Sequence, residues 1–261
     1  MKKALYNIIG TNYNSTRCAD PTITERLYQL LSAEQGNLYL DIGCGTGNYT
    51  LALSDKGLNL YGVDPSEIMI QTAQSRNQTI QWKLGTAENI PSESSMFDGI
   101  IGTLTLHHWK NLQKGFKELY RVLKNGGKAV FFTSTPEQMN YYWLNYYFPE
   151  MLERSILQMP SLEVITDAAF KAGFGGIETE KFYVRDNLQD HFLYVGKNTP
   201  ALYFNKAIQN GISSFSSLAH NEEIKLGLSK LKSDMDAGLF LDIKSQYDND
   251  LGDYLFVIVG K

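Results

Sequence analysis

The hydrophobic and polar positions of this chain change their period along its length, and the changes predict alternating strands and helices. Short apolar runs, such as 38–42, are typical of buried strands. Elsewhere apolar residues recur every three or four positions, as in 112–123, which predicts helices with one buried face. Strands joined to helices by short loops predict a parallel sheet covered on both faces. The expected strands are 38–42, 59–64, 79–85, 97–106, 128–134, 176–184 and 253–261, and the expected helices are 20–31, 48–57, 65–76, 111–127 and 161–174.

The alternation breaks at two segments, which we expect to be insertions in a single α/β domain over 1–261. The first, 136–160, is rich in aromatic residues and has no strand pattern. Its part "MNYYWLNYYF" could form an aromatic lid over an apolar pocket with a few hydroxyls, or a helix that packs its own hydrophobic face on the domain. The second, 187–240, has a mostly helical pattern, and could complete the lid or form the contact of a homodimer.

Composition and charge narrow the class of protein. The 261 residues are 43% hydrophobic with a net charge of −4, and no block of consecutive basic residues is present, which argues against a broad nucleic-acid interface. The two cysteines, Cys18 and Cys44, fit no metal spacing and no disulfide framework. Apolar runs are too short for a signal peptide or a membrane span. We therefore expect a cytoplasmic protein without nucleic-acid or membrane partners.

The stretch "LYLDIGCGTGNYT" combines a buried strand with a turn that carries very little side chain. Gly43, Gly45 and Gly47 stand at alternate positions, which is typical of a backbone that a ligand approaches closely. The dinucleotide pattern G-x-G-x-x-G fails here, and no Gly-Lys-Ser/Thr of a phosphate loop follows. In a parallel sheet this turn lies at the carboxyl ends of the strands, where ligands bind.

An acidic residue follows the glycine turn at the end of the next strand. Asp64 stands about twenty residues further along the chain. A carboxylate at that point can accept hydrogen bonds from both hydroxyls of a ribose. A glycine turn with a ribose acid and no phosphate signature indicates a nucleoside rather than a nucleotide.

Five segments in a fixed order resemble a known family. "DIGCGTG", "VDPSEIMI", "LGTAENIPSESSMFDGI", "TLTLHHW" and "ELYRVLKNGGKAVFF" occur with the order and spacing of the class I S-adenosylmethionine-dependent methyltransferases. The resemblance covers 36–135 and is greatest to the small-molecule and lipid-modifying branch. It implies an α/β, Rossmann-like, seven-stranded and mostly parallel sheet with helices on both faces and helical lid insertions. It also implies S-adenosyl-L-methionine as the cofactor.

The positions that match the family's motifs imply a cofactor site in several parts. The turn would pass under the methionine part of the cofactor, with Cys44 contributing backbone and its thiol inert. Met69 matches the apolar residue that packs on the adenine, and is equally compatible with a plain core position. The implied site residues are Asp41, Gly43, Cys44 and Gly45 in the turn, Asp64 at the ribose, Met69, Thr86 and Ala87 at the adenine, and Thr103 near the methyl group.

Three further residues are candidates on chemical grounds. Arg17 could pair with the carboxylate of the cofactor, and Tyr13 could place its ring or hydroxyl beside the sulfonium. The alternative is a surface arginine and a packing tyrosine. His107 is the candidate general base, because a histidine can take up a proton near neutral pH, although a structural role is also compatible.

These observations predict an enzyme that methylates a small, partly apolar molecule by in-line attack of the acceptor on the methyl carbon. Holding the two reactants in line and away from water supplies most of the rate. One alternative is a regulatory protein that binds S-adenosylmethionine without turnover. Another is an RNA or protein methyltransferase, which would need a basic domain or patch that the acidic balance does not supply.

Overall fold

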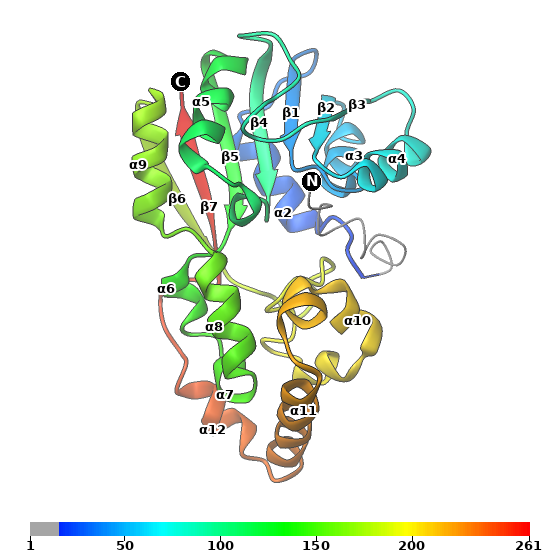
Figure 1. Cartoon of the computed structure of the whole chain (residues 1–261), viewed down its shortest axis with the longest axis vertical. Coiled ribbons are helices and arrows are strands. Elements are labelled where there is room, and N and C mark those ends of the chain that lie inside the picture. Colours follow the sequence, from blue (N-terminus) through cyan, green and yellow to red (C-terminus); the bar gives the residue numbers. More distant parts are fainter. Residues whose placement is uncertain (1–15) are drawn as a thin grey trace.

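The structure is a computed structural model that describes residues 16–261. An α/β layer forms one half of the molecule, and a helical cap, made of residues 136–160 and 187–250, forms the other (Figure 1). The cap lies beyond the carboxyl end of β4, on the side to which its arrow points (Figure 1). Both insertions predicted from the sequence therefore belong to the cap.

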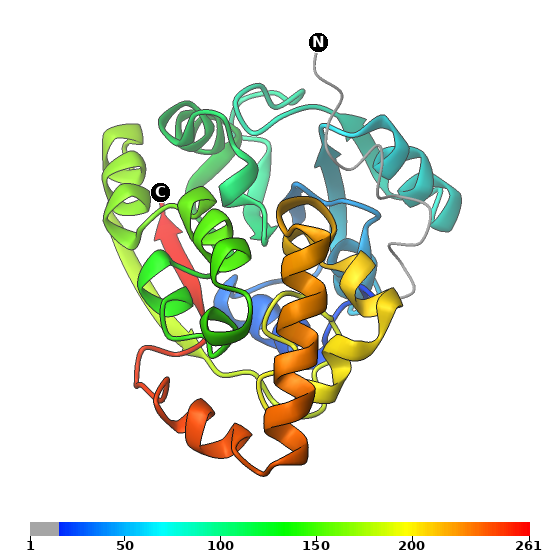
Figure 2. The same ribbon diagram turned by 60° about the horizontal axis from the view of Figure 1, so that its bottom comes forward.

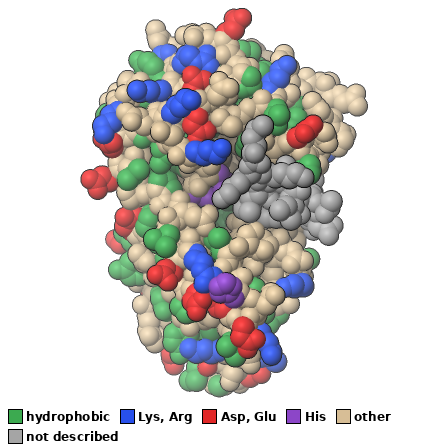
Figure 3. All heavy atoms as spheres, viewed as in Figure 1, with side chains coloured by type: hydrophobic (Ala, Val, Ile, Leu, Met, Phe, Trp, Pro, Cys, Tyr) green, Lys and Arg blue, Asp and Glu red, His purple; other side chains and the backbone are tan. Residues whose placement is uncertain are grey.

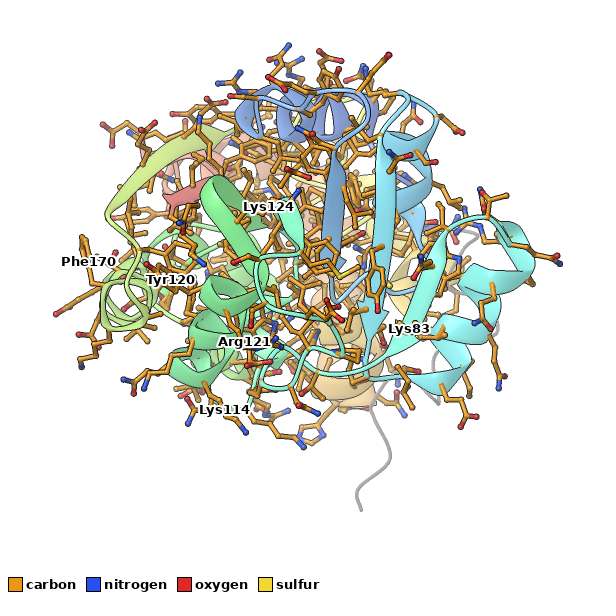
Figure 4. The ribbon with its side chains drawn as sticks, turned by 90° about the horizontal axis from the view of Figure 1, so that it is seen from above. Lys83, Lys114, Tyr120, Arg121, Lys124 and Phe170 are labelled. Atoms are coloured by element: carbon orange, nitrogen blue, oxygen red, sulfur yellow. The ribbon has the colours of Figure 1, made fainter. Side chains whose placement is uncertain are left out.

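Within the described residues, seven strands form one sheet in the order β3-β2-β1-β4-β5-β7-β6. Neighbouring strands are parallel from β3 to β5, whereas β7 is antiparallel to both β5 and β6. The predicted α/β fold with a seven-stranded, mostly parallel sheet is confirmed. Figure 4 looks from the side away from the cap and shows Lys83 of β3 and Phe170 of α9 toward opposite sides of the layer. The strands are β1 (Leu38–Ile42), β2 (Asn59–Asp64), β3 (Gln81–Leu84), β4 (Phe97–Thr103), β5 (Leu123–Thr133), β6 (Gly176–Phe182) and β7 (Tyr254–Gly260).

The sheet is covered on both faces because successive strand residues point to opposite sides. On β5, Ala129 and Phe131 join the hydrophobic cluster under α5 and α9, whereas Val130 and Phe132 join the cluster on the side of α2, α3 and α4. The helices of this layer are α2 (Pro21–Leu30), α3 (Asn48–Ser54), α4 (Glu67–Arg76), α5 (Leu112–Val122) and α9 (Leu162–Ala172).

Several strand boundaries differ from the expected ones by one or two residues, and two differ by more. β4 ends at Thr103 instead of 106, because Leu104 has a positive φ of 51° and the short 3-10 helix η2 (Leu106–His108) follows. β5 begins at Leu123, directly after α5 and several residues before the expected start at 128. The first of these differences turns the residues after β4 toward the cap side of the sheet.

The cap is built around a core of aromatic rings. Tyr142, Trp143, Tyr147 and Phe148 are all buried, and the Trp143 ring meets the Phe240 ring edge to face at 5.0 Å. Figure 2 shows these helices gathered on one side of the sheet, with α11 running across them. The cap elements are α6 (Pro136–Met139), α7 (Leu144–Tyr147), α8 (Pro149–Gln158), η3 (Pro200–Phe204), α10 (Lys206–Gly211), the π-helical turn η4 (Ser214–Leu218), α11 (Asn221–Asp236) and α12 (Phe240–Ser245).

A buried carboxylate braces the chain segments that join the cap to the sheet. Asp253, which precedes β7, accepts hydrogen bonds from the Val184 backbone N–H at 2.7 Å and from Lys197 Nζ at 2.8 and 2.9 Å. The Tyr142 hydroxyl donates to the Asp253 carbonyl at 2.5 Å. These contacts fix the cap relative to the carboxyl end of the sheet. No helix in the part of the chain that the structure describes is both long and apolar enough to cross a membrane.

Candidate functional site

A cavity of about 680 Å³ lies between the carboxyl ends of the strands and the cap. In Figure 3 the surface is hollowed between the two halves, and histidine atoms are visible there. The cavity brings together most of the site residues predicted from the sequence. Those that line it are Arg17, Gly43, Gly45, Asp64, Met69, Thr86, Ala87, Thr103 and His107.

The glycine turn forms part of the cavity wall, and its first two glycines have different structural roles. Gly43 and Gly45 have φ values of 75° and 55°, which glycine adopts more readily than other residues. A Cβ on Gly43 would lie 2.1 Å from Thr105 Oγ1, so this glycine lets the turn pack on the segment after β4. A Cβ on Gly45 would meet nothing within 4 Å. Gly45 therefore keeps open a space that a ligand can enter.

Asp64 is the buried acid beside this open space. Its Oδ2 accepts the Gly45 backbone N–H at 3.0 Å, and its Oδ1 accepts the Ser66 backbone N–H at 2.8 Å. Burial raises the pKa of Asp64 to about 6, although the two backbone donors lower it. The side chain is thus mostly a carboxylate at neutral pH, and each oxygen can accept one more hydrogen bond. This arrangement fits the two hydroxyls of a ribose.

Asp41 lies behind the turn and not in the cavity wall. Thr50 Oγ1 donates to Asp41 Oδ2 at 2.6 Å, whereas Asp41 Oδ1 has no hydrogen-bond partner among the described residues. Burial raises the pKa of Asp41 to about 7, and the nearby charge of Asp64 also raises it. Asp41 therefore links β1 to α3, the two elements that flank the turn, and its predicted contact with the cofactor stays a prediction.

The thiol of Cys44 faces the core, as the structural interpretation of that side chain expects. A Cβ on Gly62 of β2 would lie 3.0 Å from Cys44 Sγ, which places the sulfur against the strand beside Trp82. Burial raises the pKa of this thiol well above its ordinary value. A protonated, enclosed thiol is unreactive, so only the backbone of Cys44 belongs to the turn.

The predicted adenine residues lie together on the far side of Asp64. Met69 is buried on α4, and Thr86 and Ala87 follow β3 at the same end of the sheet. Glu88 Oε1 accepts the backbone N–H groups of Lys110 and Asn111 at 2.6 and 3.1 Å. This carboxylate ties the segment after β3 to the segment after η2.

His107 and His108 occupy η2, and their ring centroids are 3.9 Å apart. Burial, His108 and Arg17 all lower the pKa of His107 well below its ordinary value, and burial lowers the pKa of His108 to about 4. Both rings are therefore neutral at pH 7. His107 Nδ1 has no hydrogen-bond partner among the residues that the structure describes. His107 lines the cavity, but its Nδ1 atom is enclosed by protein and the low pKa makes the ring a weak base, so the general-base role of His107 stays a prediction.

Arg17 lies in the cavity wall and is paired with an acid from the second insertion. Its Nε and Nη2 donate to Asp190 Oδ1 and Oδ2 at 2.5 and 3.3 Å, and the Tyr49 hydroxyl donates to Asp190 Oδ2 at 3.1 Å. The sequence alone did not indicate Asp190. A guanidinium has five N–H donors, so the pair with Asp190 does not exclude a bond to a cofactor carboxylate. The predicted pairing of Arg17 with that carboxylate stays a prediction. Tyr13 lies outside the described residues.

The sequence did not predict which residues line the cap side of the cavity. From the aromatic segment 139–148 only Met139 reaches the cavity, because the rings that follow it pack in the cap core or lie on its surface. These rings therefore do not line the cavity, and most of them pack inward, as the alternative of a buried hydrophobic face expects; the role of 136–160 as a lid stays a prediction, since Ser155, Gln158 and Met159 of that segment line the cavity. The cap-side wall consists of Met139, Ser155, Gln158, Met159, Phe192, Leu193, Ile212, Ser213, Ser214 and Leu218.

Comparisons with known proteins agree with this geometry. The model of a family described as "Methyltransferase domain" matches residues 40–131. A malonyl-[acyl-carrier protein] O-methyltransferase of Herminiimonas arsenicoxydans is 32% identical over 174 residues, which span 66% of this chain and 65% of the relative. A demethylmenaquinone methyltransferase of Staphylococcus epidermidis is 28% identical over 58% of this chain and 73% of the relative.

A solved structure covers more of the chain. It comes from Anabaena variabilis, where the protein is described as a candidate methyltransferase of an antibiotic biosynthesis pathway. It is 31% identical, covers 94% of this chain and 99% of its own length, and superposes with a TM-score of 0.83. The match therefore includes the cap as well as the sheet. The chain belongs to the class I S-adenosylmethionine-dependent methyltransferases.

Proposed function

We propose that this protein transfers the methyl group of S-adenosylmethionine to a small, partly apolar acceptor. The supporting observation is the cavity itself, in which the cofactor-side residues face an apolar wall of the cap. Asp64 and Gly45 would hold the ribose and the methionine part, and Met69 the adenine. The cofactor supplies a methyl group on a positively charged sulfur, which is already an activated leaving group.

The residues of the chain would align the acceptor and exclude water, which can lower the barrier by several kcal/mol. If the acceptor is a hydroxyl or an amine, the ring of His107 would take up its proton. The lowered pKa of His107 keeps the ring unprotonated near neutral pH, but it also makes the ring a weaker base than an ordinary histidine. An acceptor that is already an anion would not need this step.

The family by itself does not select the acceptor. The two curated relatives are named for a malonyl group on a carrier protein and for a demethylmenaquinone. The match spans about 65% of the first relative, so its acceptor is not carried over. We propose a small-molecule acceptor because the cavity is enclosed on the cap side. A cytoplasmic location and the absence of a nucleic-acid partner remain part of this proposal.

The test is incubation of the protein with methyl-labelled S-adenosylmethionine and a metabolite extract, followed by mass spectrometry. Label on a low-mass metabolite supports the proposal, and the Asp64→Ala variant serves as the inactive control. Tight binding of S-adenosylhomocysteine without transfer to any extract would favour a regulatory binding protein. Label on RNA or protein alone would favour an RNA or protein methyltransferase.

A further inference from the structure

The cap side of the cavity wall carries no charge in the part of the chain that the structure describes. Its side chains are apolar, such as Met159, Phe192 and Leu218, or uncharged and polar, such as Ser155 and Ser214. A charged group pressed against this wall would lose its hydration without gaining a partner, which is strongly unfavourable.

The charged residues of the cavity lie outside the cap-side wall and have roles of their own. Arg17 is paired with Asp190, and Asp64 accepts two backbone N–H groups. Glu88 likewise accepts two backbone N–H groups, and Lys110 is exposed at the rim. None of these four side chains belongs to the cap-side wall, although Arg17 is held by Asp190 of the cap and its charge reaches His107.

Two buried serines, Ser155 and Ser214, are among the polar residues of the cap-side wall. Ser155 Oγ lies 2.9 Å from Ser214 Oγ and 2.7 Å from the Met151 carbonyl oxygen. A hydroxyl has one proton, and a carbonyl can only accept, so the Ser155 proton goes to Met151. The Ser214 hydroxyl then donates to Ser155. In this arrangement Ser214 Oγ keeps a lone pair, and because Ser214 lines the cavity the hydroxyl can offer a hydrogen-bond acceptor there.

The element that carries Ser214 is unusual. η4 is a π-helical turn in which the Ala219 backbone N–H donates to the Ser214 carbonyl at 2.9 Å. Such turns are rare and occur frequently at functional sites. Phe215 packs its ring on Phe148 in the cap core at 5.1 Å. The turn is therefore anchored from behind, while Ser214 and Leu218 line the cavity.

We propose that the wall formed by α8 and η4 selects an uncharged, mainly apolar methyl acceptor and hydrogen-bonds a donor group of that acceptor through Ser214. This inference rests on the proposed function, because it takes the cap half of the cavity as the acceptor site. It adds that the acceptor is uncharged, and it names the residue that recognises the polar group of the acceptor.

The charge preference is tested with two fluorescent probes that share one skeleton. N-phenyl-1-naphthylamine is neutral, and 8-anilinonaphthalene-1-sulfonate adds an anionic group. With the full chain saturated by S-adenosylhomocysteine, we expect the neutral probe to bind at least about tenfold more tightly, because the sulfonate would be desolvated without a partner. Equal or tighter binding of the sulfonate would overturn the proposal.

A matched pair of variants tests whether the preference for the neutral probe arises at the cap-side wall. Leu218→Lys places a cation in the wall and should reduce or reverse the preference for the neutral probe. Leu226→Lys introduces the same charge at an exposed position of α11 and should leave the preference unchanged. If the two variants behave alike, the probes bind outside the cap wall and the proposal fails.

The hydrogen bond is tested by displacement of the neutral probe with 4-hexylphenol and 4-hexylanisole, which differ in the O–H donor. We expect the phenol to bind about fivefold better, the factor that one net hydrogen bond of ordinary strength supplies. Ser214→Ala should bring the ratio close to one, whereas Ser217→Ala, at an exposed position of the same turn, should preserve it. A ratio unaffected by Ser214→Ala would contradict the role of Ser214.

Calorimetry with S-adenosylhomocysteine separates the two levels of inference. If the wild type does not bind this nucleoside, the proposed function fails. If it binds, and Ser214→Ala and Leu218→Lys bind it equally well, the variants are folded. If the neutral probe is then not preferred, only the proposal about the charge of the acceptor fails, and the proposed function is unaffected.

Discussion

Removal of the Asp64 carboxylate should abolish most of the affinity for the cofactor. The side chain is 8% exposed, and its two oxygens already accept backbone N–H groups of Gly45 and Ser66 at 3.0 and 2.8 Å. Each oxygen would accept a ribose hydroxyl as well. A hydrogen bond to a charged group contributes about 1.5–3 kcal/mol, so the loss of two costs about 3 kcal/mol or more. That corresponds to an increase in Kd of more than about 100-fold.

The assay is isothermal titration calorimetry with S-adenosylhomocysteine at pH 7.5, on wild type, Asp64→Ala and Asp64→Asn. Asp55→Asn is the matched control, because Asp55 is an exposed carboxylate at the end of α3. Asp64→Asn removes the buried charge but turns an amide NH2 toward one of the two backbone N–H groups of Gly45 and Ser66, so some loss of stability is expected. A folded Asp64→Ala variant with a Kd within threefold of wild type would refute the ribose assignment.

The pH dependence gives an independent check on Asp64. Its pKa of about 6 means that the carboxylate becomes protonated as the pH falls through 6. One of its oxygens then carries a proton and accepts hydrogen bonds less well. The affinity of the wild type for S-adenosylhomocysteine should therefore weaken as the pH falls from 7.5 to 5. The same titration of Asp64→Asn should lack this step.

The remaining predictions concern the turn, the base and the cap. Gly45→Ala should weaken cofactor binding at least about tenfold in calorimetry, because the new methyl group enters the open space, whereas Gly43→Ala should mainly lower the melting temperature, since its Cβ would overlap Thr105. Asp41→Asn should gain stability relative to wild type as the pH rises from about 4 to 8, measured by urea unfolding. The reason is that the folded pKa of Asp41 is raised, so wild type must give up a proton that the native state holds more tightly. His107→Phe should lower kcat at least about 100-fold for a hydroxyl acceptor and leave the Kd of S-adenosylhomocysteine within threefold. Trp143→Ala should cost about 3–5 kcal/mol in urea unfolding through the cavity that it leaves in the cap.

For each of these predictions, a specific result would contradict the reasoning. Equal losses of affinity in Gly43→Ala and Gly45→Ala would show that only turn rigidity matters. A stability difference between Asp41→Asn and wild type that does not change with pH would mean that Asp41 titrates normally. Unchanged turnover in His107→Phe would assign proton removal to another group or to water. A Trp143→Ala variant as stable as wild type would contradict the aromatic core of the cap.

The sequence by itself determined the α/β layer, because the signals for that layer are local. A period of two or of three to four positions follows directly from the geometry of strands and helices. Caps are local as well: Asp20 accepts the N–H groups of Thr22 and Ile23 at the start of α2, at 2.9 and 3.1 Å. The glycine turn and Asp64 were also predictable, because both follow strands whose carboxyl ends meet at one edge of the sheet.

Only the tertiary structure decided the cap side of the site. Arg17 and Asp190 are 173 positions apart, and no spacing in the sequence connects them. The aromatic residues of 139–148 have the same composition whether they line a pocket or fill a core, and the packing against Tyr203 and Phe240 makes them a core. The wall that faces the acceptor is assembled from short segments far apart in the chain, so its chemistry depends on how those segments pack together.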